Sequence, residues 1–260
     1  MSPLYNKSYP AVWSEYPFIA AYIHEPTQRY CDAAGLSPHW LLAAASCLSR
    51  RYHDSSPEGQ SPFVAYCGES WRYPERITYV KYSLTHPRFH PTDVNRRYLY
   101  NIGLIQVVTS MSSACSGWSS ISLMSHQFLT DRYGSTVTAV GWGVDRYGTS
   151  MIRESPKWPL MAYKAVAYSD SCPGSFGYGR LKQSEEENNT KNVYCLALPP
   201  YLGEQSDPIH GGLLLSGGKL IAVYLQEERR SWGAQSAEYT GIWRHLPWIQ
   251  ETASESDRTD

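Results

Sequence analysis

The feature that most constrains the fold of this chain is a succession of short apolar stretches separated by clusters of Gly, Pro, Ser and Asp. Runs of this kind that are rich in aromatic and β-branched residues are typical of strands, and the chain contains 21 Tyr and 9 Trp. Their spacing predicts an all-β barrel or sandwich. The candidate strands are Phe18–Ile23, Trp40–Ala44, Arg76–Tyr82, Gly103–Val108, Ser135–Gly141, Met161–Ala167, Asn192–Ala197, Gly212–Leu215, Lys219–Tyr224 and Glu238–Thr240.

Two local patterns refine this prediction. Gly217-Gly218 lies between two apolar runs and indicates a hairpin turn. In Gly241–Ala253 the apolar residues recur at helical spacing, which predicts one short C-terminal helix. We expect a domain over residues 1–250, followed by a polar tail, Glu251–Asp260.

Composition excludes several function classes. The 260 residues suffice for a sizeable core. The formal net charge is −1, with no basic patch of the kind that nucleic acid or a membrane surface requires. The chain has no apolar run of about 18 residues, so we expect no membrane insertion, and it shows no signal peptide pattern at its start.

The cysteines and sequons favour a secreted or extracellular protein. Six cysteines without CxxC spacing argue against a zinc site and for disulfides. Asn6 and Asn188 each begin an N-x-[ST] sequon, a candidate for glycosylation. His86 and His90 lie four residues apart, but Pro87 argues against helical metal spacing. We therefore expect neither a metal nor a cofactor.

One segment carries a specific family resemblance. CDAAGLSPHWLLAAASC, from Cys31 to Cys47, resembles CGGSLISPxWVLTAAHC of trypsin-like serine proteases. Further matches follow in the family's order over about Glu15 to Ile249. They are HPRF (family HPxY), NIGLIQV (DIALLKL), VTAVGWG (VTGWG), GGLLLSGGKLIAV (the segment after the nucleophile) and YTGIWRHLPWI (YTRVSxYxxWI).

The resemblance implies two packed six-stranded antiparallel β-barrels with an active-site cleft between them. The N-terminal barrel would span about 13–125, the C-terminal barrel about 130–240 and the C-terminal helix about 241–253. It also implies the disulfides Cys31–Cys47 and Cys172–Cys195. For Cys67 and Cys115 no family bridge applies, so they either pair with each other or leave a free thiol.

The same resemblance indicates that the catalytic machinery has been lost. Hydrolysis needs a hydroxyl nucleophile, an imidazole base and a carboxylate that orients the imidazole. The base position holds Ser46, the carboxylate position Asn101 and the nucleophile position His210. A serine cannot accept a proton near neutral pH, and an amide cannot stabilise an imidazolium as a carboxylate does. All three positions therefore argue against catalysis.

The positions that support the nucleophile differ as well. Pro208 replaces a glycine whose N–H contributes to the oxyanion hole, and proline has no N–H. Ile209 replaces the aspartate that pairs with the activated N-terminus, and Tyr5–Ser8, YNKS, stands where the family has IVGG. The position at the base of the specificity pocket holds Glu204.

Three hypotheses follow. The first is a catalytically inactive homologue that binds another protein (a protease, an inhibitor, a receptor or a complex subunit) through its surface loops. The second is a residual hydrolase in which Ser46 and His210 have exchanged roles, or in which Ser206 serves as nucleophile. The third is a small-ligand binder that uses the vacated specificity pocket. The candidate binding loops are Ser49–Trp71, Gly143–Pro159, Pro173–Lys191 and Glu227–Ala237.

Overall fold

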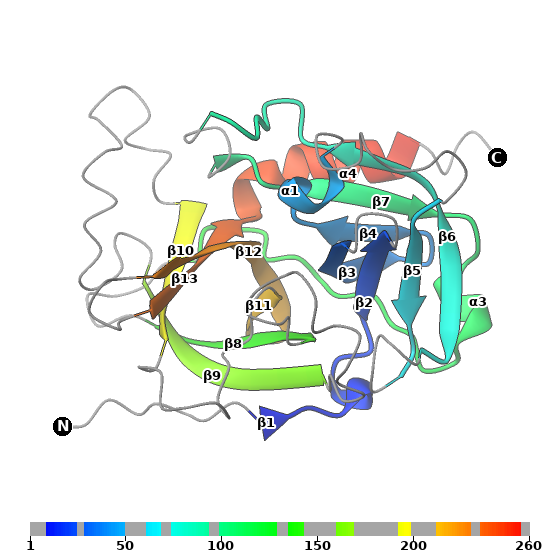
Figure 1. Cartoon of the computed structure of the whole chain (residues 1–260), viewed down its shortest axis with the longest axis horizontal. Helices are drawn as coiled ribbons and strands as arrows, with labels where there is room; N and C mark the ends of the chain where they lie inside the picture. Colours follow the sequence, from blue (N-terminus) through cyan, green and yellow to red (C-terminus); the bar gives the residue numbers. More distant parts are fainter. Residues whose placement is uncertain are drawn as a thin grey trace.

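The structure is a computed structural model. It describes residues 9–24, 29–49, 61–68, 74–93, 99–128, 135–142, 160–168, 192–198, 212–229 and 235–255. Two antiparallel barrels lie side by side, and the C-terminal helix runs across one end of the pair (Figure 1).

The first barrel is closed by six strands in the order β2-β3-β4-β7-β6-β5. Its core is filled mainly by apolar side chains of these strands, among them Ala33, Leu41 and Ile105. All six residues of β2, IAAYIH, are buried. In β6 the pattern alternates instead, with Thr78 buried between the exposed Ile77 and Tyr79. The strands are β2 (Ile19–His24), β3 (Arg29–Ser37), β4 (Trp40–Ala43), β5 (Phe63–Tyr66), β6 (Arg76–Thr85) and β7 (Gly103–Val107).

The second barrel follows the same plan. Its strands pair in the order β9-β10-β13-β12-β11-β8, and β8 pairs back onto β9 to close the ring, while the short strand β1 (Tyr9–Pro10) adds to β9. The fold class expected from the sequence is thus confirmed. The strands are β8 (Ser135–Trp142), β9 (Leu160–Tyr168), β10 (Val193–Leu198), β11 (Leu213–Ser216), β12 (Lys219–Arg229) and β13 (Gln235–Gly241).

The turn between β11 and β12 shows why glycine is needed there. Gly217 and Gly218 both have positive φ, at 56° and 73°. A two-residue turn with two such residues matches the right-handed twist of the flanking strands, and glycine adopts it without steric cost. The hairpin predicted from this pair is present between β11 and β12.

The C-terminal segment differs from the expected helix in its bounds. Strand β13 continues to Gly241, a 3-10 turn covers Trp243–His245, and α4 spans Leu246–Glu255. The helix therefore begins five residues later than expected and includes Glu251, which the sequence suggested as the start of the polar tail. Among the described residues no helix is long and apolar enough to cross a membrane.

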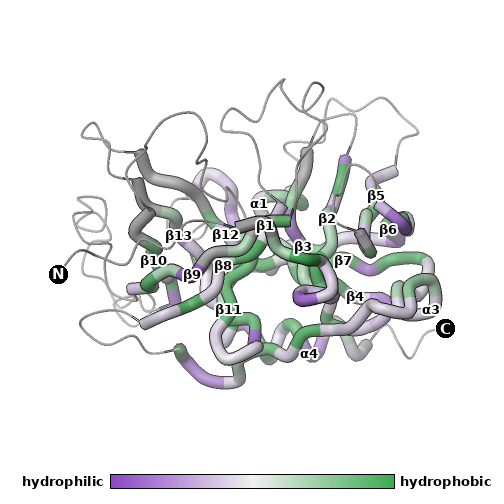
Figure 2. The backbone as a smooth tube through the Cα atoms, turned by 90° about the horizontal axis from the view of Figure 1, so that it is seen from below, coloured by the Kyte–Doolittle hydropathy of each residue, from purple (hydrophilic) through white to green (hydrophobic). Residues whose placement is uncertain are grey.

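One core cluster joins the two barrels. It contains Ile19 and Leu104 from the first barrel, Val140 and Leu213 from the second, and Ile249 from α4. All five side chains are at most 2% exposed. Figure 2 shows hydrophobic stretches of β3, β8 and β11 meeting in the middle of the molecule. The barrels therefore share an apolar core, and a buried polar group that lies between them needs a hydrogen-bond partner there.

Candidate functional site at the junction of the barrels

Asn101 is the polar residue at the centre of this junction. It immediately precedes Ile102 and β7, and its side chain is fully buried. Its Oδ1 accepts a hydrogen bond from the backbone N–H of Ser46 at 2.7 Å, and its Nδ2 donates to the carbonyl of Tyr224 in β12 at 3.3 Å. A backbone N–H can only donate and a carbonyl can only accept, so the orientation of the amide is fixed.

The first of these hydrogen bonds caps a helix. The short helix α1 (Ala45–Leu48) leaves backbone N–H groups without intrahelical partners in its first turn, and its N-cap residue, Ala44, offers no side-chain acceptor. Asn101 supplies that acceptor to Ser46 from a distant part of the sequence. The second hydrogen bond crosses to the other barrel, so one amide side chain ties α1 to β12.

The Asn101 side chain differs from the carboxylate of a catalytic triad in two ways: it is uncharged, and it donates one of its hydrogen bonds. An ionised carboxylate only accepts hydrogen bonds, so it could not replace the amide opposite the Tyr224 carbonyl. The structure brings Ser46 and Asn101 together through the helix cap, with Ser46 half-buried. His210, Ser206, Pro208, Ile209 and Glu204 lie outside the described residues, as do Asn6 and Asn188.

The buried histidine of the C-terminal segment is engaged elsewhere. His245 is 3% exposed, and its Nε2 lies 2.9 Å from the Leu99 carbonyl and 3.1 Å from Nδ2 of Asn192. Because the carbonyl can only accept, we assign the proton to Nε2 and the hydrogen bond to Leu99. His245 thus links the C-terminal segment to the first barrel, and among the described residues its ring contacts the Leu99 carbonyl and Asn192 and forms no clear Ser–His–Asp triad.

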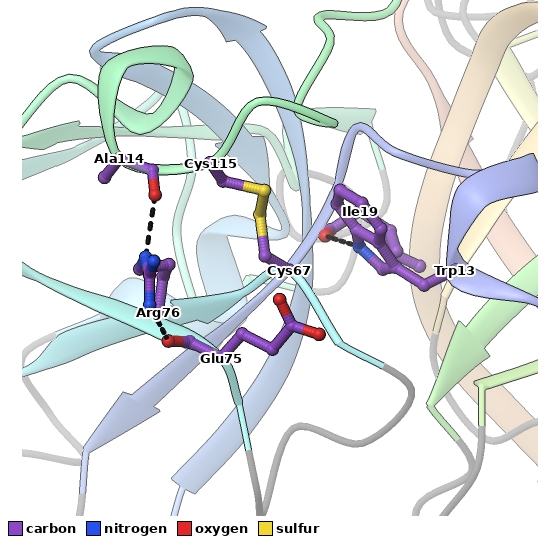
Figure 3. Close-up of a disulfide and its surroundings, with 7 residues drawn as sticks. All are labelled: Trp13, Ile19, Cys67, Glu75, Arg76, Ala114 and Cys115. Carbon is purple, nitrogen blue, oxygen red and sulfur yellow. Dashed lines mark hydrogen bonds between the residues drawn. A yellow bond between two sulfur atoms is a disulfide. The ribbon is translucent and has the colours of Figure 1, made fainter.

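Disulfides lie beside the site and at the far side of the first barrel. Cys31 and Cys47 are bridged, which joins β3 to α1 next to Ser46. Cys67 and Cys115, whose pairing the sequence left open, form a second bridge that ties the end of β5 to the segment after α3 (Met111–Ala114) (Figure 3). Cys195 is also disulfide-bonded, and Cys172, the partner expected for it, lies outside the described residues.

Asp32 is a polar contact across the barrels that the sequence reasoning did not single out. It lies in β3 beside Cys31 and is 8% exposed. Its Oδ1 accepts a hydrogen bond from the backbone N–H of Trp142 in β8 at 3.2 Å. Gly141 leaves room for it, because a Cβ there would lie 2.5 Å from Asp32 Oδ2. The sequence did contain a sign of this contact. The residue after Cys31 is Asp32, whereas the trypsin-like motif CGGSL has glycine at that position.

No metal centre forms in the part of the chain that the structure describes. There, no group of three or more His, Cys, Asp or Glu side chains is placed to hold an ion. His90 is used locally, since its Nδ1 lies 3.1 Å from the hydroxyl of Thr92 and accepts a hydrogen bond from the backbone N–H of Asp93.

No protein-family model matches the chain, and no curated protein sequence matches it. Many solved structures do, and one of them is neuropsin, a serine protease expressed in the limbic system of mouse brain. The match covers 95% of this chain and 99% of neuropsin, with a TM-score of 0.65 and 19% sequence identity. This chain has the trypsin-like serine protease fold. The likeness at this identity describes the fold alone, so activity and role have to be argued from the residues of the site.

Proposed function

We propose that this chain is a catalytically inactive serine protease homologue that acts by binding another protein. The observation that carries the proposal is the two-way hydrogen bonding of Asn101, whose amide accepts from Ser46 and donates to Tyr224. A buried group that must donate to a carbonyl cannot be the carboxylate that a Ser–His–Asp mechanism requires. Ser46 at the base position and Pro208 at the oxyanion position support the same conclusion.

The proposed mode of action is regulatory. A rigid double barrel that presents loops without turning over a substrate is suited to act as a cofactor, as a decoy in a protease pathway, or as a receptor ligand. We further propose that the protein is secreted, because its disulfides require an oxidising compartment.

The test is incubation of the purified chain with a diverse peptide library, with cleavage read by mass spectrometry. Ser46→Ala and His210→Ala are the matched controls. We expect no cleavage above these controls, and the next step is then capture of the binding partner. Cleavage that disappears in both variants contradicts the proposal and establishes the alternative, a hydrolase with a swapped Ser46–His210 pair.

A further inference from the structure

A cavity of about 490 Å³ lies where the residues after β6 and before β7 meet the C-terminal segment. Its volume falls within the range of about 300–1,000 Å³ that is typical of small-molecule sites. Aromatic and imidazole rings form a large part of its described wall, so it is suited to contact a flat ligand. The described residues that line it are His86, Arg88, Leu99, Tyr100, Asn192, Trp243, Arg244, His245 and Pro247.

The His86 ring contributes a hydrogen-bond donor to this wall. Its Nδ1 accepts a hydrogen bond from the backbone N–H of Arg88 at 3.1 Å. Burial lowers the pKa of His86 to about 4, with a further lowering from the charge of Arg88, so the ring is neutral near pH 7. A neutral imidazole carries one proton, and because Nδ1 is the acceptor, the proton lies on Nε2. Among the described residues none accepts a hydrogen bond from this Nε2.

The His245 ring contributes a hydrogen-bond acceptor in the same way. Its Nε2 donates to the Leu99 carbonyl at 2.9 Å. Burial lowers the pKa of His245 to about 4, with further lowering from His86 and Arg244, so this ring is also neutral near pH 7. With the proton on Nε2, the Nδ1 atom holds a lone pair and can accept a hydrogen bond. The two rings therefore offer one donor and one acceptor to a ligand in the cavity.

Ring contacts hold the two imidazoles in place. His86 stacks on Tyr100 with ring centroids 5.0 Å apart and an interplanar angle of 27°. It also lies edge-on to His245, with centroids 4.9 Å apart, and against Trp248 at the same distance. Because these rings are fixed before a ligand arrives, little conformational entropy is lost when it binds.

A ligand that fits these groups is flat and uncharged, and it carries both a carbonyl and an N–H group. The carbonyl would accept a hydrogen bond from Nε2 of His86, and the N–H would donate to Nδ1 of His245. One small molecule can reach both atoms, because the two imidazole rings are in contact. Its ring system would contact Tyr100 and Trp243 in the wall of the cavity. We propose that this cavity binds a planar heterocycle that contains a cyclic amide, an inference that goes beyond protein binding.

The experiment uses the full chain and three fused-ring probes that differ in their polar groups. 2-Quinolone carries the carbonyl and the N–H, 1-methyl-2-quinolone keeps only the carbonyl, and indole keeps only the N–H. Binding is measured by calorimetry near pH 7. We expect 2-quinolone to bind about tenfold more tightly than either of the others, because each of them leaves one polar atom of the cavity without a partner.

A variant locates the site. His86→Phe removes the donor and keeps a ring, so it should weaken the binding of both quinolones about tenfold and leave the binding of indole unchanged. His126→Phe is the matched control, because His126 is exposed and is not among the described residues of the cavity wall. It should leave all three affinities unchanged. Circular dichroism checks that each variant is folded, and the probe series on the wild type tests the proposal without any substitution.

Three results would overturn the proposal. Equal affinities of the three probes for the wild type indicate unspecific apolar binding. If His86→Phe weakens all three probes alike, or none of them, Nε2 of His86 does not contact the carbonyl. Absence of 2-quinolone binding at millimolar concentration excludes the site. The peptide-library experiment measures cleavage and this one measures binding of small molecules, so failure of this proposal is distinguishable from failure of the proposed function.

Discussion

At the residue scale, the identity of Asn101 follows from its two backbone partners. Replacing it with Asp changes one N–H donor into an oxygen and adds a charge in a fully buried position opposite the Tyr224 carbonyl. We expect Asn101→Asp to lower the free energy of unfolding by about 2–4 kcal/mol near neutral pH, because the substitution introduces a buried charge next to a carbonyl that has lost its donor. Urea unfolding measures this loss.

The same variant distinguishes a structural amide from a damaged triad. Protonation of the new carboxyl restores a donor, so the deficit of Asn101→Asp should shrink as the pH is lowered. If Asn101→Asp is as stable as the wild type and also cleaves peptides, the site lacks only the carboxylate for hydrolysis. That result would contradict the structural role assigned to the Asn101 amide.

At the element scale, the two fully described disulfides close loops of different length. The Cys31–Cys47 bridge spans 16 residues and the Cys67–Cys115 bridge spans 48. In the chain-entropy model the shorter loop contributes about 3 kcal/mol and the longer about 4 kcal/mol. We expect the double substitution of Cys67 and Cys115 by Ala to cost more stability in urea than that of Cys31 and Cys47. The reverse order would mean that native packing around Cys31–Cys47 outweighs loop entropy.

The elements also show what a sequence of this kind can and cannot predict. The ten expected strands all coincide with strands of the structure, because each has apolar runs bounded by turn residues. Strand β3 was missed because CDAAGLS has neither alternation nor β-branched residues, and β5 because FVAY is short and follows a proline. The resemblance supplied the barrel arrangement that strand patterns alone left as barrel or sandwich.

Within the site, the sequence predicted which residues occupy the triad positions, but it did not predict their hydrogen-bond partners. The sequence identified Ser46 and Asn101 as departures from a triad, but the helix cap and the contact with Tyr224 depend on geometry across 55 and 123 positions. The contact of His86 with His245 and Trp248 was missed for the same reason, since these residues are far apart in the sequence and meet only when the C-terminal segment packs against the first barrel.

At the scale of the whole molecule, the two barrels share a core, and neutral histidines help to join them. His245 donates to the Leu99 carbonyl and lies against His86, with Arg88 and Arg244 nearby. In the unfolded chain a histidine titrates near 6.5, whereas in the folded protein the pKa of each is about 4. Between these values the unfolded state binds more protons, so stability must fall as the pH is lowered.

The expected loss is complete near pH 4 and absent above about pH 6.5. For His245, which is 3% exposed, the change in pKa corresponds to at most about 3 kcal/mol. His86 is less buried and adds less. His245→Gln keeps an amide donor for Leu99 but cannot titrate, so its stability should decline less between pH 6.5 and 4 than that of the wild type. The exposed His126, replaced by Gln, is the matched control. Parallel curves for wild type and His245→Gln would mean that other groups, chiefly the carboxylates, govern acid unfolding of the joined barrels.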